Sequence, residues 1–294
     1  MDKRHTFADV YKRTFIIKTL NMRKTNLITL AIGGLLLMAP KLAVAQSSKD
    51  SKWTIIPRAG MAISTITGDA DEDVDDAYGS RVGFGGGVEA EYHFNKTFGL
   101  SLGAFYTKLG SKVYIEMLAA AKDKAQEPYV MYEGDPDDFI SKVTYGKDSH
   151  INIADYTDDY NHVEHIHNLK AALGYINIPL MLNVHLPLNI PVGVTVKAGA
   201  QMDILVSAKA KGDVQTYDNG NYGNTSYSNS IKDGLKDFGF TIPAGLAVSY
   251  KNIELDARYL WNVTNINDGS DYDEPSGKNH NSTFLITLGY NFKL

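Results

Sequence analysis

The sequence predicts an all-β fold, an eight-stranded antiparallel up-and-down transmembrane β-barrel with long extracellular loops. Three observations predict it. Eight segments of the 294-residue chain alternate apolar and polar residues with a period of two, as strands do. Short turns and long connections alternate between these segments, which is typical of outer-membrane barrels. In the clearest segments, 81–94, 192–210 and 253–261, the charged side chains lie on one face and the apolar or small side chains on the other.

The first 45 residues have the order of a secretory signal peptide. A basic stretch, Met22-Arg23-Lys24, is followed by the apolar run Leu27–Met38 and then by Ala43-Val44-Ala45. The apolar run has about 12 residues, whereas a membrane-spanning helix needs roughly 20. A short membrane anchor is the alternative. We therefore expect residues 1–45 to be an N-terminal extension with a cleaved signal peptide, and residues 46–294 to form the barrel domain.

Composition excludes several classes of site. The chain has no cysteine, which excludes a disulfide framework, a cysteine zinc site, a cysteine nucleophile and a lipid-anchored cysteine. The formal net charge is −5, so no basic excess is available to neutralise nucleic-acid phosphates. After residue 45 the chain has 21 basic and 32 acidic residues. The predicted exported part is therefore decidedly acidic, and we expect no nucleic-acid partner.

The alternation is clearest between Arg81 and Phe94. Val82, Phe84 and Val88 share one face of this segment, and Glu89 and Glu91 share the other. Each predicted strand can supply the roughly 9–11 tilted residues that cross a bilayer. The eight predicted strands cover residues 52–64, 81–94, 97–109, 173–186, 192–210, 237–250, 252–262 and 282–294.

The connections divide into two kinds. Three are short: Asn95-Lys96, Lys251-Asn252 and the run Pro187–Pro191. Four are long, and they contain 25 of the 32 acidic residues that follow residue 45. Short periplasmic turns and long extracellular loops are the expected topology. The long connections cover residues 65–80, 112–170, 211–236 and 263–281.

Alternation alone does not say which face points outward, because a soluble lipocalin-type barrel alternates with its apolar face inward. Three features favour the apolar face outward. Opposite charges and glycines share the polar face, Tyr and Trp cluster near strand ends as interfacial girdles do, and the chain stops inside a strand. Carboxylates sealed inside a barrel need cationic partners. We therefore expect an internal charge network that joins Glu89, Glu91, Asp203, Glu254 and Asp256 to Arg58, Lys197, Lys209 and Arg258.

The last strand, Phe284–Leu294, resembles the C-terminal signal by which the barrel-assembly machinery recognises its clients, although Leu294 replaces the commoner terminal Phe. Other stretches resemble the PorT-like outer-membrane β-barrel domain family. The resemblance implies an eight-stranded barrel in the outer membrane of a Gram-negative cell, and one family member takes part in protein secretion. The stretches are Gly174–Leu182, Lys197-Ala198-Gly199, Ser207-Ala208-Lys209, Asp237-Phe238-Gly239 and Leu255–Tyr259.

Three loop segments could carry more than a connection. The acidic stretch Gly68–Asp76 has the spacing of a calcium loop but lacks its central Gly and its bidentate Glu, so a solvated loop is the alternative. His162, His165 and His167 lie among carboxylates and could bind zinc or nickel, or could simply be polar loop residues. The segment Tyr114–Lys122 has helical propensity and predicts a short helix.

A catalytic site is not predicted. A rim-sited enzyme acting on lipid needs a His beside a Ser or an acid, and His93 and His185 have no Ser beside them by sequence logic. An eight-stranded barrel has room inside only for side chains, which argues against a diffusion pore. The sequence therefore assigns no catalytic, cofactor-binding or metal-binding residue.

The expected function is that of a non-enzymatic, surface-exposed anchoring or interaction barrel of the cell outer membrane. One alternative is an accessory component of an envelope or protein-secretion machine, and a lipid-modifying enzyme is a third hypothesis. The expected partners are outer-membrane lipid and lipopolysaccharide, the barrel-assembly machinery during insertion, and a protein or glycan at the loops. The Tyr- and Asn-rich stretch Tyr217–Tyr227 suits such a surface.

Overall fold

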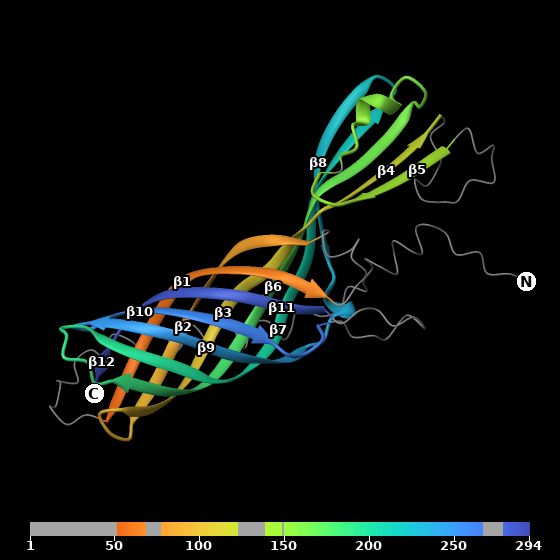
Figure 1. The fold of residues 1–294 in the computed structure, drawn as a ribbon. Helices are drawn as coiled ribbons and strands as arrows, with labels where there is room; N and C mark the ends of the chain where they lie inside the picture. The colour runs from red at the N-terminus through yellow and green to blue at the C-terminus, as the bar shows by residue number, and fades with distance from the viewer. Residues whose placement is uncertain (1–51, 69–77, 123–138, 149, 267–278) are drawn as a thin grey trace, which may run out of the picture.

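The computed structural model describes residues 52–68, 78–122, 139–148, 150–266 and 279–294, and it is an antiparallel β-barrel with a sheet projecting from one end (Figure 1). Within these residues no helix is both long and apolar enough to cross a membrane. The predicted signal peptide lies outside the described residues. The barrel strands are β1 (Trp53–Gly68), β2 (Tyr78–His93), β3 (Phe98–Val113), β6 (His162–Leu186), β7 (Gly193–Asp218), β9 (Phe238–Tyr250), β10 (Ile253–Asn262) and β11 (Asn279–Tyr290).

These eight strands form a closed ring. Each pairs antiparallel with the next along the chain, and β11 returns to pair with β1. The short strand β12 (Phe292–Lys293) extends the pairing on β1. Closure satisfies the backbone polar groups of every strand, which a bilayer requires. All eight predicted strands are confirmed.

The tight turns predicted between neighbouring strands are present at one end of the barrel, which we call the short-turn end. Asn95 accepts hydrogen bonds from the backbone N–H groups of Thr97 and Phe98, both at 2.8 Å. Lys251 adopts a positive φ of 54° in the two-residue turn between β9 and β10. The C-terminus lies at this end, and the projecting sheet rises from the other, the long-loop end (Figure 1).

The outer face of the barrel is apolar. Its side chains are exposed although they are large and hydrophobic, among them Met61, Val82, Leu102, Leu246 and Leu288. Water would penalise such a surface, whereas lipid accepts it. The predicted orientation, with the apolar face outward, is confirmed.

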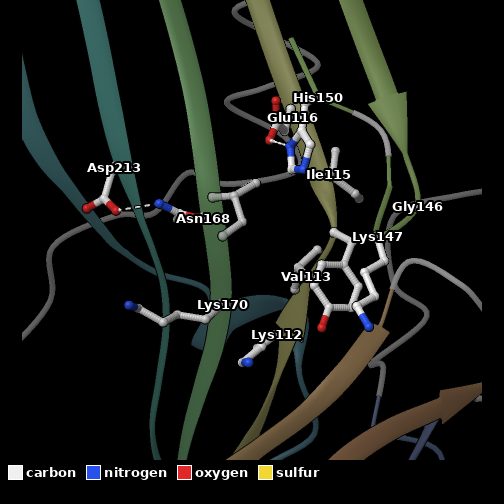
Figure 2. A pocket seen from close by; sticks show the side chains of 12 residues that line it. Lys112, Val113, Ile115, Glu116, Gly146, Lys147, His150, Asn168, Lys170 and Asp213 are labelled. Carbon is white, nitrogen blue, oxygen red and sulfur yellow. Dashed lines mark hydrogen bonds and ion pairs between the residues drawn. The ribbon is translucent and has the colours of Figure 1, made fainter. Parts of the chain in front are cut away.

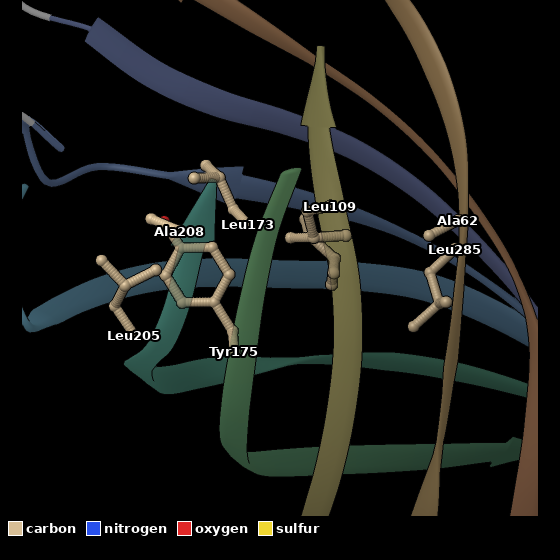
Figure 3. Close-up of a cluster of buried hydrophobic side chains, with 8 residues drawn as sticks. Ala62, Leu109, Leu173, Tyr175, Leu205, Ala208 and Leu285 are labelled. Atoms are coloured by element: carbon tan, nitrogen blue, oxygen red, sulfur yellow. The ribbon is translucent and has the colours of Figure 1, made fainter. Parts of the chain in front are cut away.

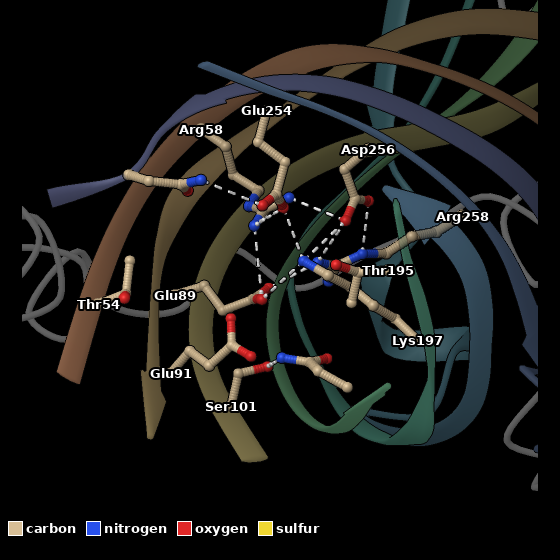
Figure 4. Close-up of polar contacts among 12 residues, drawn as sticks. Thr54, Arg58, Glu89, Glu91, Ser101, Thr195, Lys197, Glu254, Asp256 and Arg258 are labelled. Atoms are coloured by element: carbon tan, nitrogen blue, oxygen red, sulfur yellow. Dashed lines mark hydrogen bonds and ion pairs between the residues drawn. The ribbon is translucent and has the colours of Figure 1, made fainter. Parts of the chain in front are cut away.

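Ionic side chains fill the barrel near the short-turn end (Figure 4). Arg58 contacts Glu254 at 3.0 Å and Asp256 at 2.9 Å. Arg258 contacts Glu89 at 2.6 Å and Asp256 at 2.7 Å. Lys197, which is almost fully buried, lies 2.7 Å from Glu254. Three cations thus face three carboxylates, so this charge network is neutral as a whole.

Three residues expected in the charge network lie outside it. Asp203 has no cationic partner among the described residues and is held by neutral donors instead, including Asn177 Nδ2 at 2.6 Å. Glu91 pairs with His185, closer to the short-turn end. Lys209 is exposed, because the register shifts where Gly174 and Tyr175 of β6 pair with β7. A β-bulge of this kind reverses which residues point inward, and the alternation gives no sign of it.

The interior is not polar throughout. An apolar layer crosses the barrel between the charge network and the long-loop end (Figure 3). It consists of Ala62, Leu109, Leu173, Tyr175, Leu205, Ala208, Leu260 and Leu285. Beside the network, the space bounded by Arg58, Phe105 and Arg258 has a volume of about 10 Å³. That is at most room for one water molecule, so side chains fill this cross-section.

Candidate functional site: the projecting sheet

Five strands continue beyond the long-loop end as the projecting sheet (Figure 1). It consists of β4 (Ile115–Ala121), β5 (Phe139–Tyr145) and β8 (Asn221–Ser230), together with residues 162–167 of β6 and 213–218 of β7. The strand order is β5-β4-β6-β7-β8. The helix predicted at Tyr114–Lys122 is wrong. This segment is strand β4, because β5 and β6 pair with its two edges.

An irregularity in β6 marks the point where the sheet leaves the barrel. The register with β7 shifts between His167 and Lys170, and Asn168 adopts a positive φ of 53°. Asn tolerates this left-handed conformation better than most residues. Its side chain donates a hydrogen bond to Asp213 Oδ2 at 3.1 Å, which ties the bulge to β7.

The projecting sheet has an apolar core of its own. Leu118 and Ala120 of β4 and Val163 of β6 are buried on one face. Ile151 and Ile153 cover them from the segment that leads into the short 3-10 helix η2 (Ile153–Tyr156). Burial of this kind is the main source of stability for a sheet in water, so the projecting sheet is a folded unit and not a set of loose loops.

Glu116 ties three parts of the projecting sheet together. Its carboxylate accepts a hydrogen bond from the Ile151 backbone N–H at 2.8 Å. His165 Nε2 lies 3.0 Å from Oε2 and His150 Nδ1 lies 3.1 Å from Oε1. Burial alone would raise the pKa of Glu116, but these hydrogen bonds outweigh it and lower the pKa below its ordinary value.

A pocket of about 370 Å³ lies at the base of the projecting sheet (Figure 2). Three exposed lysines line it, Lys112, Lys147 and Lys170, together with Glu116 and Asp213. The lysines come from β3, from the segment after β5, and from β6. The base of the sheet therefore presents three lysine ammonium groups close to two carboxylates.

The histidines predicted as possible metal ligands do not form one site. His162 pairs with Asp218 at 3.0 Å and His165 pairs with Glu116. The rings of His165 and His167 stack, with centroids 4.9 Å apart. The acidic stretch Gly68–Asp76 lies outside the described residues except for Gly68 itself.

Strand β8 forms one edge of the projecting sheet. It pairs with β7, and it is the last strand in the order among the described residues. Its ten residues contain no charge and no proline, the usual devices that block pairing at an edge. Tyr222 is exposed, and its ring centroid lies 5.1 Å from that of Tyr217. The predicted Tyr- and Asn-rich surface is thus part of an edge strand.

A second polar cluster lies at the short-turn end and was not recognised from the sequence. The structure brings Glu91, His93 and His185 together. The alternation places all three on the polar face of their strands, but β3 lies between β2 and β6, and only the folded barrel shows that the side chains of Glu91 and His185 meet inside it.

Comparison with known proteins gives a family. A family model described as an outer membrane protein beta-barrel domain matches residues 44–268. No curated protein matches the sequence. The PorT-like family is narrower than the family that this model describes, so membership in it stays an expectation.

Several solved structures are similar to this chain at low identity. Ail of Yersinia pestis, in complex with the heparin analogue sucrose octasulfate, is 16% identical, with a TM-score of 0.34 over 82% of this chain and 99% of that chain. Neisserial surface protein A is 13% identical, with a TM-score of 0.34 over 82% and 98%. OprG of Pseudomonas aeruginosa is 12% identical, with a TM-score of 0.33 over 83% and 98%. At this level of likeness we draw no conclusion about function from them.

Proposed function

Since the chain belongs to the outer membrane protein beta-barrel domain family, we propose that it is an exported, non-enzymatic barrel of the cell outer membrane that anchors the projecting sheet outside the cell as a binding surface. The observation that carries this proposal is the projecting sheet itself. A five-stranded sheet with its own apolar core is more structure than a loop needs in order to join two strands.

The barrel interior favours an anchor over a conduit. The charge network fills the barrel beside the short-turn end, and the apolar layer crosses it farther along. Moving a solute through would require breaking buried ion pairs, which costs about 3–5 kcal/mol for each lost partner. The functional surface is therefore expected outside the barrel.

The edge strand β8 suits a protein or glycan partner. An unblocked edge can accept a further strand from a protein, with main-chain hydrogen bonds supplying affinity. Tyr222 is exposed on β8 with Asn and Ser residues beside it, and such side chains form adaptable contacts in many binding surfaces. This edge runs from the barrel, where Ser230 pairs with Lys209, to the far end of the projecting sheet, where Tyr222 pairs with Tyr217.

The pocket at the base of the projecting sheet suits the lipid environment instead. Lys112, Lys147 and Lys170 line this pocket, beyond the long-loop end of the barrel (Figure 2). Lysines at the base of the projecting sheet can pair with the phosphates of lipopolysaccharide. We assign the base of the sheet to membrane contact and its outer edge to the partner.

Site-specific photo-cross-linking in living cells tests the proposal. A photoreactive amino acid is placed at Tyr222 in the projecting sheet, and at Lys96 in a short turn as the matched control. We expect a cross-linked protein or glycan at position 222 and none at position 96. A partner captured at Lys96 but not at Tyr222 would favour the alternative, an accessory part of an envelope or secretion machine.

A lipid analysis tests the enzymatic hypothesis directly. The outer-membrane lipids of a deletion strain are compared with those of the parent. We expect identical profiles, because a surface-binding barrel modifies no lipid. A lipid species that disappears on deletion and returns with the wild-type gene would contradict the non-enzymatic proposal.

A further inference from the structure

We propose that Glu91, His93 and His185 form a binding site for one divalent transition-metal ion of the zinc class at the short-turn end of the barrel. In the described part of the chain, this is the only group of three His, Asp or Glu residues whose ligand atoms all lie within 4.8 Å of one another. The site is independent of the projecting sheet and of its partner.

The three ligand atoms converge. His185 Nε2 lies 2.8 Å from Glu91 Oε1, and His93 Nδ1 lies 3.8 Å from the same oxygen. In a tetrahedral zinc site with bonds of about 2.0–2.1 Å, neighbouring ligand atoms lie about 3.3 Å apart. A shift of about half an ångström would therefore bring these atoms to zinc-binding distance.

The second nitrogen of each imidazole is already held. His185 Nδ1 lies 2.9 Å from Thr195 Oγ1, and His93 Nε2 lies 3.0 Å from Thr54 Oγ1. Metal-binding histidines commonly use the other ring nitrogen in this way, which fixes the ring orientation and the tautomer. Both hydroxyls can accept that N–H, which leaves the other nitrogen of each ring facing Glu91 (Figure 4 shows Thr54, Glu91 and Thr195).

The chemistry of the ligand set selects the metal class. Two imidazoles and one carboxylate suit Zn²⁺ and neighbouring first-row ions, whereas Ca²⁺ and Mg²⁺ prefer oxygen ligands alone. Three protein ligands leave one position for water or for a further ligand. The carboxylate of Glu91 is almost buried, while the side chains of His93 and His185 are 28% and 26% exposed. A metal ion can therefore reach the site from the short-turn end.

The packing around Glu91 leaves room for its carboxylate. A Cβ atom at Gly99, on the neighbouring strand β3, would lie 2.3 Å from Glu91 Oε1. Glycine at this position thus allows the carboxylate to sit between the strands.

Calorimetric titration with Zn²⁺ tests the site. The mature protein, without a polyhistidine tag, is stripped with chelator and titrated in detergent. We expect one high-affinity site, and we expect the double variant His93→Gln with His185→Gln to weaken it by at least about 100-fold. His150→Gln with His162→Gln, both in the projecting sheet, is the matched control and should leave the affinity unchanged.

A conservative variant separates metal binding from folding. Thr195→Val removes only the hydroxyl beside His185 and should weaken Zn²⁺ binding by about 10-fold, with unchanged heat-modifiability on a gel. Bound Co²⁺ should show the intense visible absorption of a four-coordinate site. Absence of Zn²⁺ binding by the wild-type protein, or equal affinity in the wild-type and double-variant proteins when both are folded, would overturn the proposal.

Discussion

The barrel and the projecting sheet are built partly from the same two strands, β6 and β7, yet the barrel buries many polar side chains beside its apolar layer, whereas the sheet is held by an apolar core. In the barrel, β6 turns Asn177 and Asn183 inward and leaves Leu180 exposed. In the projecting sheet the same strand buries Val163 and Ile166. The difference shows that an alternating sequence fixes two faces, and that the surrounding solvent, lipid or water, decides which face is covered.

The two regions should therefore fail in different ways. The stability of the barrel depends on buried ion pairs whose charges balance. The stability of the projecting sheet depends on an apolar core between one face of the sheet and the segment that covers it. A change that disturbs one region should leave the other folded.

The largest effect is expected from Glu89→Gln in the charge network. Glu89 contacts Arg58, Lys197 and Arg258, so this substitution leaves an unbalanced positive charge inside the barrel. We expect the free energy of unfolding, measured by urea titration in detergent, to fall by about 3–5 kcal/mol. Asp158→Asn, at an exposed position in the turn between η2 and β6, is the control. Equal stability of the two variants would contradict the buried network.

An arginine introduced at one position in each region sharpens the comparison. Ala257→Arg places a charge on the lipid-facing side of β10, next to Leu246 and Ile286. We expect a loss of about 2–4 kcal/mol in barrel stability and reduced assembly in the outer membrane. Ser226→Arg, exposed on β8, should change stability by less than about 0.5 kcal/mol. Normal assembly of the Ala257→Arg variant would mean that this face does not meet lipid.

A cavity created in the core of the projecting sheet should destabilise the sheet and leave the barrel folded. Leu118→Ala removes a side chain that is 2% exposed in the sheet core. We expect this to destabilise the sheet by about 2 kcal/mol and to speed its cleavage by protease added to intact cells. Heat-modifiability of the barrel should stay unchanged. If the barrel unfolds together with the sheet, the two regions are not independent.

The smallest effect is a dependence on pH. Because hydrogen bonds lower the pKa of Glu116 in the folded state, its carboxylate adds stability above the ordinary carboxyl pKa. That contribution is lost as the pH falls through the lowered value. Protease cleavage of the sheet should therefore rise on acidification, and Glu116→Gln should flatten this rise. An identical pH profile in the variant would exclude Glu116 as the cause.

The sequence predicted the barrel well, because lipid-facing strands must alternate over their whole length. The ring, the tight turns and the inward side chains of Arg58, Lys197 and Arg258 follow from that alternation. Lys209 was placed wrongly, because a β-bulge in β7 shifts the alternation by one residue. Such a shift arises from strand pairing and has no local signal.

The projecting sheet was largely missed for a different reason. Strands β4 and β5 have seven residues each, and β4 is rich in alanine, so its local preference is helical. Pairing with β5 and β6 overrides that preference. The cluster of Glu91, His93 and His185 was missed as a unit, because strand register, which no single segment contains, brings β2 and β6 together.

Labelling of single cysteines on intact cells tests the central claim most directly, since the native chain has no cysteine to interfere. The claim is that the projecting sheet lies outside the cell and the short turns lie on the inner side of the outer membrane. A membrane-impermeant maleimide should label Tyr222→Cys on intact cells and should label Lys96→Cys only after the outer membrane is permeabilised. Labelling of Lys96→Cys on intact cells, with Tyr222→Cys protected, would contradict the account.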